Sequence, residues 1–457
     1  MLISDLPYLD DIIDTIGVDI NDDNFTSDEY EQILETTLSL IDSYVINHIK
    51  NMDEPEFYND MYSCIYNLLD LQLSEIFTHS IENNIEEVIN TASHDYFTNI
   101  VPRRSEGPTH IINENIDKIA MEKKIKYISD KPQPDQKTDE WYTFRHNLIT
   151  ASSAWKCIEN ESNRNQIIYE KCKPLDISKF KSTNLETTLH WGQKYEPISV
   201  MYYEKKFQTE IRDFGCIQHD KHKFLGASPD GINVDKKSPL YGRMLEIKNI
   251  VNRDITGIPK KEYWIQMQLQ METCDLDECD FLETRFKEYE DVDEFNEDGN
   301  FTYTKNNRIK GIIMLFMDGT NYHYEYMPLY HTKDMFEKWE EEMMNKNENK
   351  VWVNNIYWYL EEVSCVLVLR NKMWFESIID DIGNTWSTIE KERVTGYSHR
   401  APKKRIKKEN IKVIKSENHD DQSSNTNLKQ TKISKTSPLL SGCVIKIRTE
   451  SFDETVI

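Results

Sequence analysis

The sequence predicts an α/β protein in which a central mixed sheet is flanked by helices, with an acidic helical domain in front and more helices behind. Three observations lead to this prediction. Apolar residues recur at helical spacing through the first 100 residues, apolar runs with strand periodicity follow between about residues 224 and 317, and Trp-rich helical patterns return after residue 330. The length of 457 residues favours two or three domains over one.

The first 100 residues are interpreted as an acidic helical domain. Thr26 and Glu29 have the spacing of a capping box, and a stripe of apolar residues one turn apart follows them. This stripe consists of Leu34, Leu38, Ile41 and Val45. A second apolar stripe runs from Phe57 to Leu68, and a third helix is expected over Ser80–Thr91.

The distribution of charge along the chain says more about possible nucleic-acid binding than the total net charge does. A formal net charge of −25 argues against a nucleic-acid partner, because binding phosphate requires Lys and Arg. Residues 1–100, however, hold 22 acidic residues and one basic residue, a net charge of −21, whereas residues 131–271 hold 22 basic and 18 acidic residues. The acidity therefore belongs mainly to the front domain, and the composition leaves a nucleic-acid partner open.

Four segments follow the helical domain. Residues 101–137 contain PRRSEGP and KPQPDQK and are expected to be a linker, and residues 138–329 are expected to form the α/β core. Residues 330–393 predict a helical extension around a strand-like segment at Val363–Leu369. The polar and basic residues 394–457 are expected to be a disordered tail.

Two acidic residues in the core segment stand on predicted neighbouring strands. The sequence FLGASPDG, residues 224–231, predicts a strand that delivers Asp230 into a turn at Gly231. The sequence MLEIKN, residues 244–249, predicts a second strand, whose period of two places Glu246 and Lys248 on the same face.

This pair of carboxylates suits a hard divalent cation. Mg²⁺ and Mn²⁺ prefer oxygen ligands, and the main-chain carbonyl of Ile247 is a further candidate ligand. A lysine beside the metal can orient or help to deprotonate a water that attacks phosphorus. The competing interpretation is a hairpin with solvated charges, because isolated patterns of this length often arise by accident.

Three further motifs accompany these acids. They are DEWYTFRHNLITASSAWKCI at 139–158, LHWGQKYEP at 189–197 and EYWIQMQLQM at 262–271. The order of an Arg with ITAS, WGxxYE, SPDG, ExK and QxQ resembles the YqaJ-type viral recombinase family, the lambda exonuclease branch of the PD-(D/E)XK nucleases. Each motif alone is weak, but the ordered set between Arg145 and Met271 is specific. The resemblance does not reach the first 130 residues or the tail.

The resemblance implies a restriction-endonuclease-like core and a catalytic site. Asp230 and Glu246 match the metal-binding acids of the family, and Glu196 matches the helix carboxylate that completes the metal site. Lys248 matches the lysine that positions the water, and Gln268 matches the glutamine that lies against the site. The implied cofactor is Mg²⁺, for which Mn²⁺ can substitute.

The resemblance also implies a site for the end of the DNA strand. Arg145 and Ser152 match residues that grip the 5′-terminal phosphate, and Ser228 of SPDG matches a serine at the edge of the same path. Each assignment has an ordinary alternative. Arg145 and Gln268 suit the solvated surface of a helix, Ser152 suits a helix cap, and Glu196 before a proline suits a helix start.

The connection between the two acids is longer than in the simplest family members, since Glu246 lies 16 positions after Asp230. Pro239, Tyr241 and Gly242 have the character of a turn, so we expect the extra residues to form a loop tip on the same two strands. We also expect the acidic loop Glu288–Asp298 to lie away from the DNA path, because it would repel phosphates.

The function implied is a Mg²⁺-dependent exonuclease that digests duplex DNA ends 5′ to 3′ in recombination or repair. The alternatives are a structure-specific or single-strand endonuclease on the same fold, or a DNA-binding scaffold without catalysis. Codon usage of an AT-rich genome, indicated by only six alanines, together with the family suggests a viral source.

The sequence also predicts binding partners and a cellular location. DNA is the expected partner of the core, and a single-strand annealing or binding protein is a candidate partner of the acidic domain. A homo-oligomer is compatible with the rings that processive family members form. The sequence lacks a signal peptide and a membrane-spanning run, which predicts an intracellular protein, cytoplasmic or nuclear, with residues 403–408 (KKRIKK) as a candidate nuclear localisation signal or DNA-gripping segment.

Overall fold

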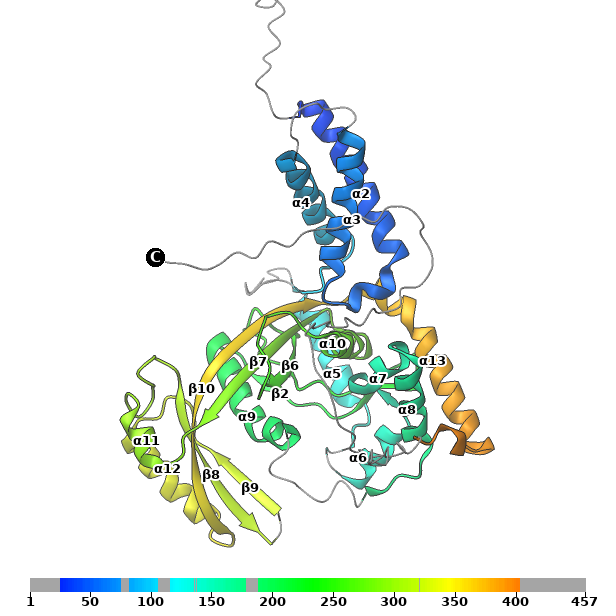
Figure 1. Cartoon of the computed structure of the whole chain (residues 1–457). Helices are drawn as coiled ribbons and strands as arrows, with labels where there is room; N and C mark the ends of the chain where they lie inside the picture. Colours follow the sequence, from blue (N-terminus) through cyan, green and yellow to red (C-terminus); the bar gives the residue numbers. More distant parts are fainter. Residues whose placement is uncertain are drawn as a thin grey trace, which may run out of the picture. The chain divides into compact units, whose positions relative to one another are not determined.

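A mixed β-sheet forms the centre of the core. The structure is a computed structural model that describes residues 25–74, 82–105, 116–134, 136, 138–177, 188–319 and 321–402. Within these residues the main sheet has seven strands (Figure 1). In spatial order they are β2 (Ile211–Arg212), β5 (Gly231–Asn233), β6 (Met244–Asn249), β7 (Glu278–Glu288), β10 (Val351–Leu369), β8 (Lys310–Asp318) and β9 (Asn321–Tyr326).

Parallel and antiparallel pairings coexist in this sheet. Strands β6 and β7 run parallel, whereas the other neighbouring pairs are antiparallel. A smaller sheet has the order β1 (Ile149–Thr150), β4 (Leu225–Ala227) and β3 (Ile217–Gln218). The predicted fold class, a mixed sheet flanked by helices with helical segments before and after it, is confirmed.

Helices pack around the sheet. In chain order they are α6 (Asp139–His146), α7 (Ala151–Ile158), α8 (Glu161–Cys172), α9 (Thr188–Phe207), α10 (Lys261–Cys274), α11 (Val292–Glu297), α12 (Lys333–Lys346), α13 (Lys372–Thr395) and the 3₁₀ turn η4 (Ser398–Arg400). None of the helices in the described part of the chain has the length and apolarity needed to cross a membrane.

Strand β6 alternates between the two faces of the sheet as predicted. Met244 belongs to the main core together with Trp264 of α10, whereas Leu245 and Ile247 pack with Tyr203 of α9. Since successive strand residues point to opposite faces, Glu246 shares the α10 face with Met244. The helix α10 is therefore the element that lies over Glu246.

The long connection between β5 and β6 keeps the two strands paired. Gly231 lies opposite Leu245 in an antiparallel register, and the turn before β6 includes Gly242 with φ of +88° and the buried Tyr241. Gly231 itself is required, because a Cβ there would collide with the side chain of Ile211 on β2. The extra residues therefore connect two paired strands, as expected, but the first of these strands is β5, which follows Asp230. The strand predicted before Asp230 is β4 instead, which belongs to the smaller sheet, and this corrects the prediction.

The C-terminal extension differs from the expected one in its strand. The predicted strand-like segment Val363–Leu369 is the end of the 19-residue strand β10, which pairs with β7 along one stretch and with β8 along another. The extension therefore contributes a central strand to the main sheet as well as the helices α12 and α13. Strands β7 and β8 lie in the region up to about residue 317 where the sequence predicts apolar runs with strand periodicity.

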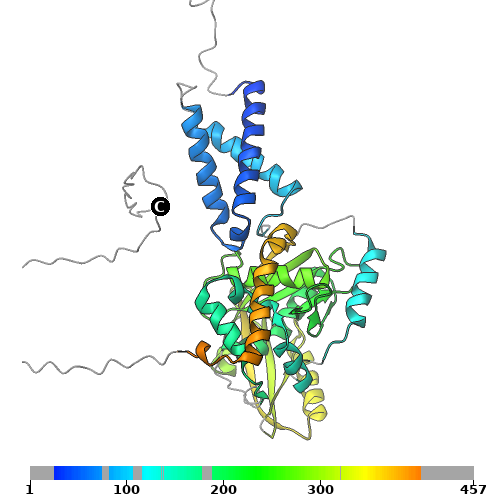
Figure 2. The same cartoon turned by 90° about the vertical axis from the view of Figure 1, so that its right-hand side faces the viewer.

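The N-terminal helices are α2 (Ser27–Asn47), α3 (Phe57–Leu73) and α4 (Glu82–Asn99), with the 3₁₀ turn η2 (Ile49–Asp53) between the first two. The capping box of Thr26 and Glu29 is present at the start of α2. Figure 2 shows these helices side by side, drawn in blue. Their apolar stripes form the core between them; its fully buried members include Ile41, Val45, Ile65 and Val88.

The expected linker contains a helix, which corrects that part of the prediction. Helix α5 (Lys118–Asp130) starts at the N-cap Asp117 and buries Ile125 and Ile128. Its amphipathic pattern, KIAMEKKIKYISD, provides two apolar positions three residues apart, which suffice to anchor it. Residues 403–457, and with them the basic segment 403–408, lie outside the described residues.

Candidate active site

Strands β5 and β6 bring the two predicted metal-binding acids together. Asp230 lies directly before β5, and its Oδ2 accepts a hydrogen bond of 2.7 Å from the backbone N–H of Ile247 on β6. Glu246 is the neighbour of Ile247 and is fully buried. The antiparallel pairing of the two strands therefore holds the carboxylates of Asp230 and Glu246 next to each other.

Lys248 lies on the same face as Glu246 and forms an ion pair with its Oε1. Although burial favours the neutral amine, the carboxylates of Glu246 and Asp230 raise the pKa of Lys248 above its usual value. The ammonium group also lies 5.1 Å from the centre of the Tyr263 ring. Lys248 is thus a permanent positive charge at neutral pH.

The second oxygen of Glu246 is held by Gln270 of α10. The Nε2 of Gln270 donates to Oε2 of Glu246 at 2.8 Å and to the carbonyl of Ser228 at 3.1 Å. Its Oε1 is buried and has no hydrogen-bond partner among the described residues. This oxygen is an unused acceptor at the site, available to a water or a metal-bound ligand.

Gln268, the glutamine favoured by the sequence motif, is not at the acids, which corrects the prediction. Its Nε2 donates to the carbonyl of Leu369 and its Oε1 accepts from the N–H of Asn371, at the junction of β10 and α13. Residues two apart on a helix point about 200° apart, so Gln268 and Gln270 cannot serve the same site. Sequence reasoning missed Gln270, although the same EYWIQMQLQM run contains it.

Burial and like charge both act on Asp230. Burial raises the pKa of Asp230 well above its usual value, and the neighbouring Glu246 raises it further, against the opposing effect of Lys248. Glu196 adds to the increase, so its carboxylate lies within electrostatic range of Asp230. The neighbouring acids and burial thus favour the neutral form of Asp230, and the positive charge of Lys248 opposes them.

Glu196 reaches this region from α9. The helix begins at Thr188 and continues through Pro197, so Glu196 lies inside the helix and not at its start, as the ordinary alternative for this residue would have it. Proline lacks the N–H that would donate to the carbonyl of Gln193 one turn earlier. Both Gln193 and Glu196 line a large cleft.

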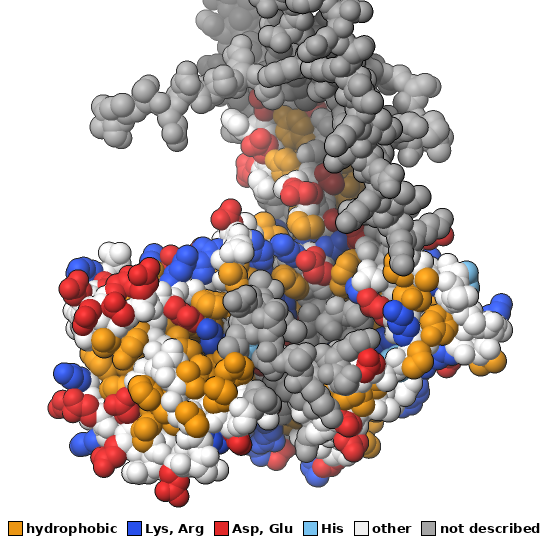
Figure 3. Space-filling model, turned by 60° about the horizontal axis from the view of Figure 1, so that its bottom comes forward, with side chains coloured by type: hydrophobic (Ala, Val, Ile, Leu, Met, Phe, Trp, Pro, Cys, Tyr) orange, Lys and Arg blue, Asp and Glu red, His pale blue; other side chains and the backbone are white. Residues whose placement is uncertain are grey.

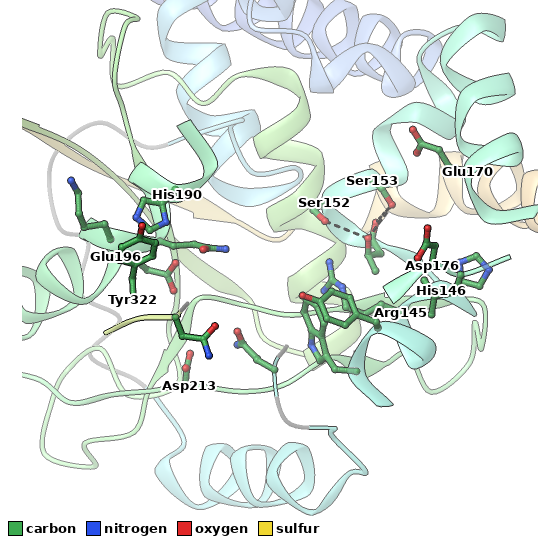
Figure 4. Close-up of a pocket in the computed structure, with 18 of the residues that line it drawn as sticks. Arg145, His146, Ser152, Ser153, Glu170, Asp176, His190, Glu196, Asp213 and Tyr322 are labelled. Carbon is green, nitrogen blue, oxygen red and sulfur yellow. Dashed lines mark hydrogen bonds between the residues drawn. The ribbon is translucent and has the colours of Figure 1, made fainter. Parts of the chain in front are cut away.

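This cleft has a volume of about 1210 Å³ and two distinct walls. Figure 4 shows Arg145, His146, Ser152 and Ser153 on one side, and His190, Glu196 and Tyr322 on the other. The first group comes from α6 and α7, and the second from α9 and β9. A cleft of this size exceeds the ~300–1,000 Å³ that hold a drug-sized ligand.

The first wall joins the predicted phosphate-binding residues. Arg145 donates from Nη1 to Oγ of Ser228 at 3.1 Å, and its guanidinium lies 4.4 Å from the centre of the Trp141 ring. Ser152 lines the cleft at the start of α7, where its hydroxyl lies 3.3 Å from that of Thr150. Ser228 therefore links the two regions, because its carbonyl accepts from Gln270 beside Glu246.

Lys171 is a cleft residue that the motifs did not indicate. It lines the cleft beside Arg145, whose carbonyl accepts a hydrogen bond of 2.7 Å from Nζ of Lys171. Burial lowers the pKa of Lys171 to about 8, and the positive charges of Arg145 and Arg393 contribute. The cations here repel one another, which lowers the lysine pKa, so a bound anion would be stabilised by all of them.

The donor set fits a hard divalent cation. Asp230, Glu246 and Glu196 offer carboxylate oxygens, the ligands that Mg²⁺ and Mn²⁺ prefer, and Gln270 adds the amide oxygen without a partner. No group of three or more His, Cys, Asp or Glu side chains is close enough to hold a metal within the part of the chain that the structure describes. The three carboxylates are therefore near each other without converging on one point.

Comparison with protein families places the site within a known domain. Residues 140–277 match the family described as the YqaJ-like viral recombinase domain. The match contains the candidate residues from Arg145 to Gln270, whereas Tyr322 of the cleft lies outside it.

One viral protein is similar to this chain over a longer stretch than the family match. The chain is 31% identical over 337 residues to an uncharacterized protein, R354, of Acanthamoeba polyphaga mimivirus, covering 65% of this chain and 58% of that protein. The chain thus spans less than two thirds of the length of this relative.

Solved structures give more distant similarities. An alkaline exonuclease (LHK-Exo) from Laribacter hongkongensis matches with a TM-score of 0.33 and 18% identity, over 56% of this chain and 94% of that one. A phage-related exonuclease from Haemophilus somnus 129PT matches with a TM-score of 0.29 and 14% identity, over 56% and 96% of the two chains.

Proposed function

Since residues 140–277 form a YqaJ-like viral recombinase domain, we propose that the chain is a Mg²⁺-dependent deoxyribonuclease that digests duplex ends 5′ to 3′ in DNA recombination. The observation that carries this proposal is the joining of Asp230, Glu246 and Lys248 with Gln270 in one buried group. Through Ser228, this group is linked to Arg145 in the adjacent cleft.

Each residue of the group has a distinct task in phosphodiester hydrolysis. Asp230 and Glu246 would hold the metal, with Glu196 as the third carboxylate. A divalent cation held by these residues would supply polarisation of the phosphate and would lower the pKa of a water. Lys248 forms an ion pair with Glu246, so its ammonium group is placed to orient the water and to offset negative charge.

Gln270 is suited to aligning the attacking water. Its amide N–H groups are engaged by Glu246 and by the carbonyl of Ser228, which fixes the orientation of the side chain. The remaining Oε1 can then accept a hydrogen bond from the water. A glutamine locked in this way positions the water without changing its own protonation.

The cationic wall of the cleft supports a proposed preference for a phosphorylated 5′ end. Arg145 offers a planar fork to a phosphate, and Ser152 and Lys171 add a hydroxyl and a second positive charge beside it. A terminal phosphate carries more negative charge than an internal one. We therefore expect the strand to be held by its 5′ end.

Digestion of end-labelled DNA tests the proposal. Linear duplex with a 5′ phosphate should release mononucleotides in Mg²⁺ and none in Ca²⁺, and a 5′-hydroxyl end should react more slowly. A covalently closed circle of the same sequence should remain intact. Cutting of the circle would replace the exonuclease with an endonuclease, and an inert linear duplex in both Mg²⁺ and Mn²⁺ would leave a DNA-binding scaffold.

A further inference from the structure

Asn249, the residue after Lys248, joins strand β6 to helix α9. Its Nδ2 donates to the carbonyl of Gly192 at 2.8 Å, and its Oδ1 accepts a hydrogen bond of 2.8 Å from Oγ of Ser199. Both partners belong to α9. A carbonyl can only accept, so the bond to Gly192 fixes which end of the amide faces which partner.

The two partners flank Glu196 along the helix. Gly192 precedes Glu196 by four positions and Ser199 follows it by three. Residues three or four positions apart are neighbours on one side of a helix. The amide of Asn249 therefore fastens α9 to β6 about one turn before Glu196 and again about one turn after it.

The fastened turn lacks one of its own hydrogen bonds. Pro197 has no N–H to donate to the carbonyl of Gln193, so the backbone around Glu196 is held less firmly than in an unbroken helix. The bonds to Asn249 act on this same turn from outside the helix. They restrain the turn where its internal ladder is interrupted.

Strand β7 holds Asn249 in turn. Oγ1 of Thr284 donates to Oδ1 of Asn249 at 2.6 Å and lies 3.0 Å from Oγ of Ser199, and both hydroxyl residues are fully buried. Strands β6 and β7 are parallel neighbours in the main sheet. The amide thus ties α9 to two central strands, one of which carries Glu246 and Lys248.

We propose that Asn249 is a positioning residue for the metal site, because it holds the turn that carries Glu196 in a fixed place on β6. The carboxylate of Glu196 is thereby set relative to those of Asp230 and Glu246. The oxygen of Asn249 is occupied by two hydroxyls, so the amide acts through Glu196 and is not itself a ligand. This inference rests on the proposed function for the divalent cation.

Mn²⁺ binding to the full-length protein without DNA tests this role, with the free ion followed by electron paramagnetic resonance. Asn249→Ala should weaken binding about 10- to 100-fold, the range for partners that orient metal ligands. Ser199→Ala removes one of the two bonds to α9 and should weaken binding by a smaller factor. Adding Asn249→Ala to Glu196→Gln protein should change the affinity by less than about 2-fold, because the amide acts through Glu196.

Tyr203→Phe is the matched control. It removes a buried hydrogen bond of 2.6 Å between the same helix and Asp280 of β7, so it should lower the stability in urea and leave the Mn²⁺ affinity per folded molecule unchanged. An unchanged affinity in Asn249→Ala would overturn the positioning role, as would an undiminished loss in the Glu196→Gln background. Wild-type protein that binds Mn²⁺ in this way and digests no duplex would overturn the nuclease proposal alone, whereas wild-type protein that binds no Mn²⁺ would overturn both.

Discussion

At the scale of single residues, the carboxylate of Glu246 is the centre of the site, because each of its oxygens has a different partner. Lys248 pairs with Oε1 and Gln270 donates to Oε2. The pattern of acids and lysine was predictable from the sequence, since strand periodicity alone places Glu246 and Lys248 on one face. The contact of Glu246 with Gln270 of α10 could not be predicted, because tertiary packing fixes the rotation of α10 against β6.

The two buried glutamines of α10 give a matched pair for mutagenesis. Gln270→Met keeps the length of the side chain but removes both hydrogen bonds and the free acceptor, so we expect kcat to fall on the order of 10²-fold. Gln268→Met removes its bonds to Leu369 and Asn371 and should lower the free energy of unfolding by about 1–3 kcal/mol, with kcat per folded molecule unchanged. Urea unfolding and single-turnover digestion measure the two effects.

The reverse result would reassign the site. If Gln268→Met lost activity at full stability while Gln270→Met remained active, the motif-based choice of Gln268 would be right and the contact of Gln270 with Glu246 would have no catalytic meaning.

Arg145 should control the response to the 5′ phosphate. Arg145→Met is expected to slow digestion of phosphorylated ends about 10- to 150-fold, the value of a hydrogen bond to a charged group, and to abolish the difference between phosphate and hydroxyl ends. Arg212→Met, an exposed arginine on β2 outside the cleft lining, is the control. A preference for phosphate that persists in Arg145→Met would assign phosphate binding to another residue.

At the scale of elements, β10 shows why the extension was only partly predictable. The residues Asn354, Asn355, Glu361 and Glu362 have low strand propensity, so they mask a 19-residue strand. The structure places register shifts at these same points, between Trp352 and Asn354 and between Leu360 and Glu362. Bulges absorb polar residues that a regular ladder would not, and a bulge cannot be recognised without the partner strand.

The loop between β7 and β8 depends on a buried lysine. Lys310 donates from Nζ to the carbonyls of Phe295, Asp298 and Asn300 and is fully buried. This loop carries the acidic helix α11, which Figure 1 places at the opposite side of the sheet from α6 and α7. Figure 3 shows acidic side chains at that outer edge, whereas Glu288 at the start of the predicted loop forms an ion pair with Lys194 of the cleft.

Removing the side-chain amine of Lys310 should lower the free energy of unfolding by a measurable amount. Lys310→Met leaves three carbonyls without their donor, and we expect the free energy of unfolding to fall by about 2–4 kcal/mol in urea titrations. The nearby exposed Lys305→Met should change it by less than about 0.5 kcal/mol. Equal effects of the two changes would show that the carbonyl contacts of Lys310 contribute nothing.

At the scale of the whole molecule, the acidic N-terminal helices are attached to the helix that carries Gln270. The indole N–H of Trp264 on α10 donates to the carbonyl of Arg104 at 2.7 Å. Lys261 at the start of α10 forms ion pairs with Glu54 and Glu159 and lies 3.7 Å from Asp53. Sequence patterns predicted the helices on each side but not this attachment, because its partners are up to 208 positions apart.

The attachment should respond to pH through Asp53. Burial raises the pKa of Asp53 to about 7, against the lowering effect of Lys261. The folded protein therefore holds a proton on Asp53 that the unfolded chain has released, between the unfolded pKa near 4 and about 7. When the folded state binds more protons, stability falls as pH rises, so the protein should lose stability from pH 4 to 7 and level off above 7.

Asp53→Asn removes the group that binds a proton in the folded state but not in the unfolded state. We expect the fall in the free energy of unfolding between pH 5 and pH 8 to shrink by about 3 kcal/mol in the variant, because two pH units of linkage at 1.36 kcal/mol each disappear. Glu54→Gln, which changes the exposed neighbour in the same network, should keep the wild-type slope. A slope that is identical in Asp53→Asn and wild-type protein would mean that Asp53 is ionised in the folded state, held charged by Lys261. The acidic domain would then be attached to α10 by a true ion pair, and high salt instead of high pH would be the condition that weakens it.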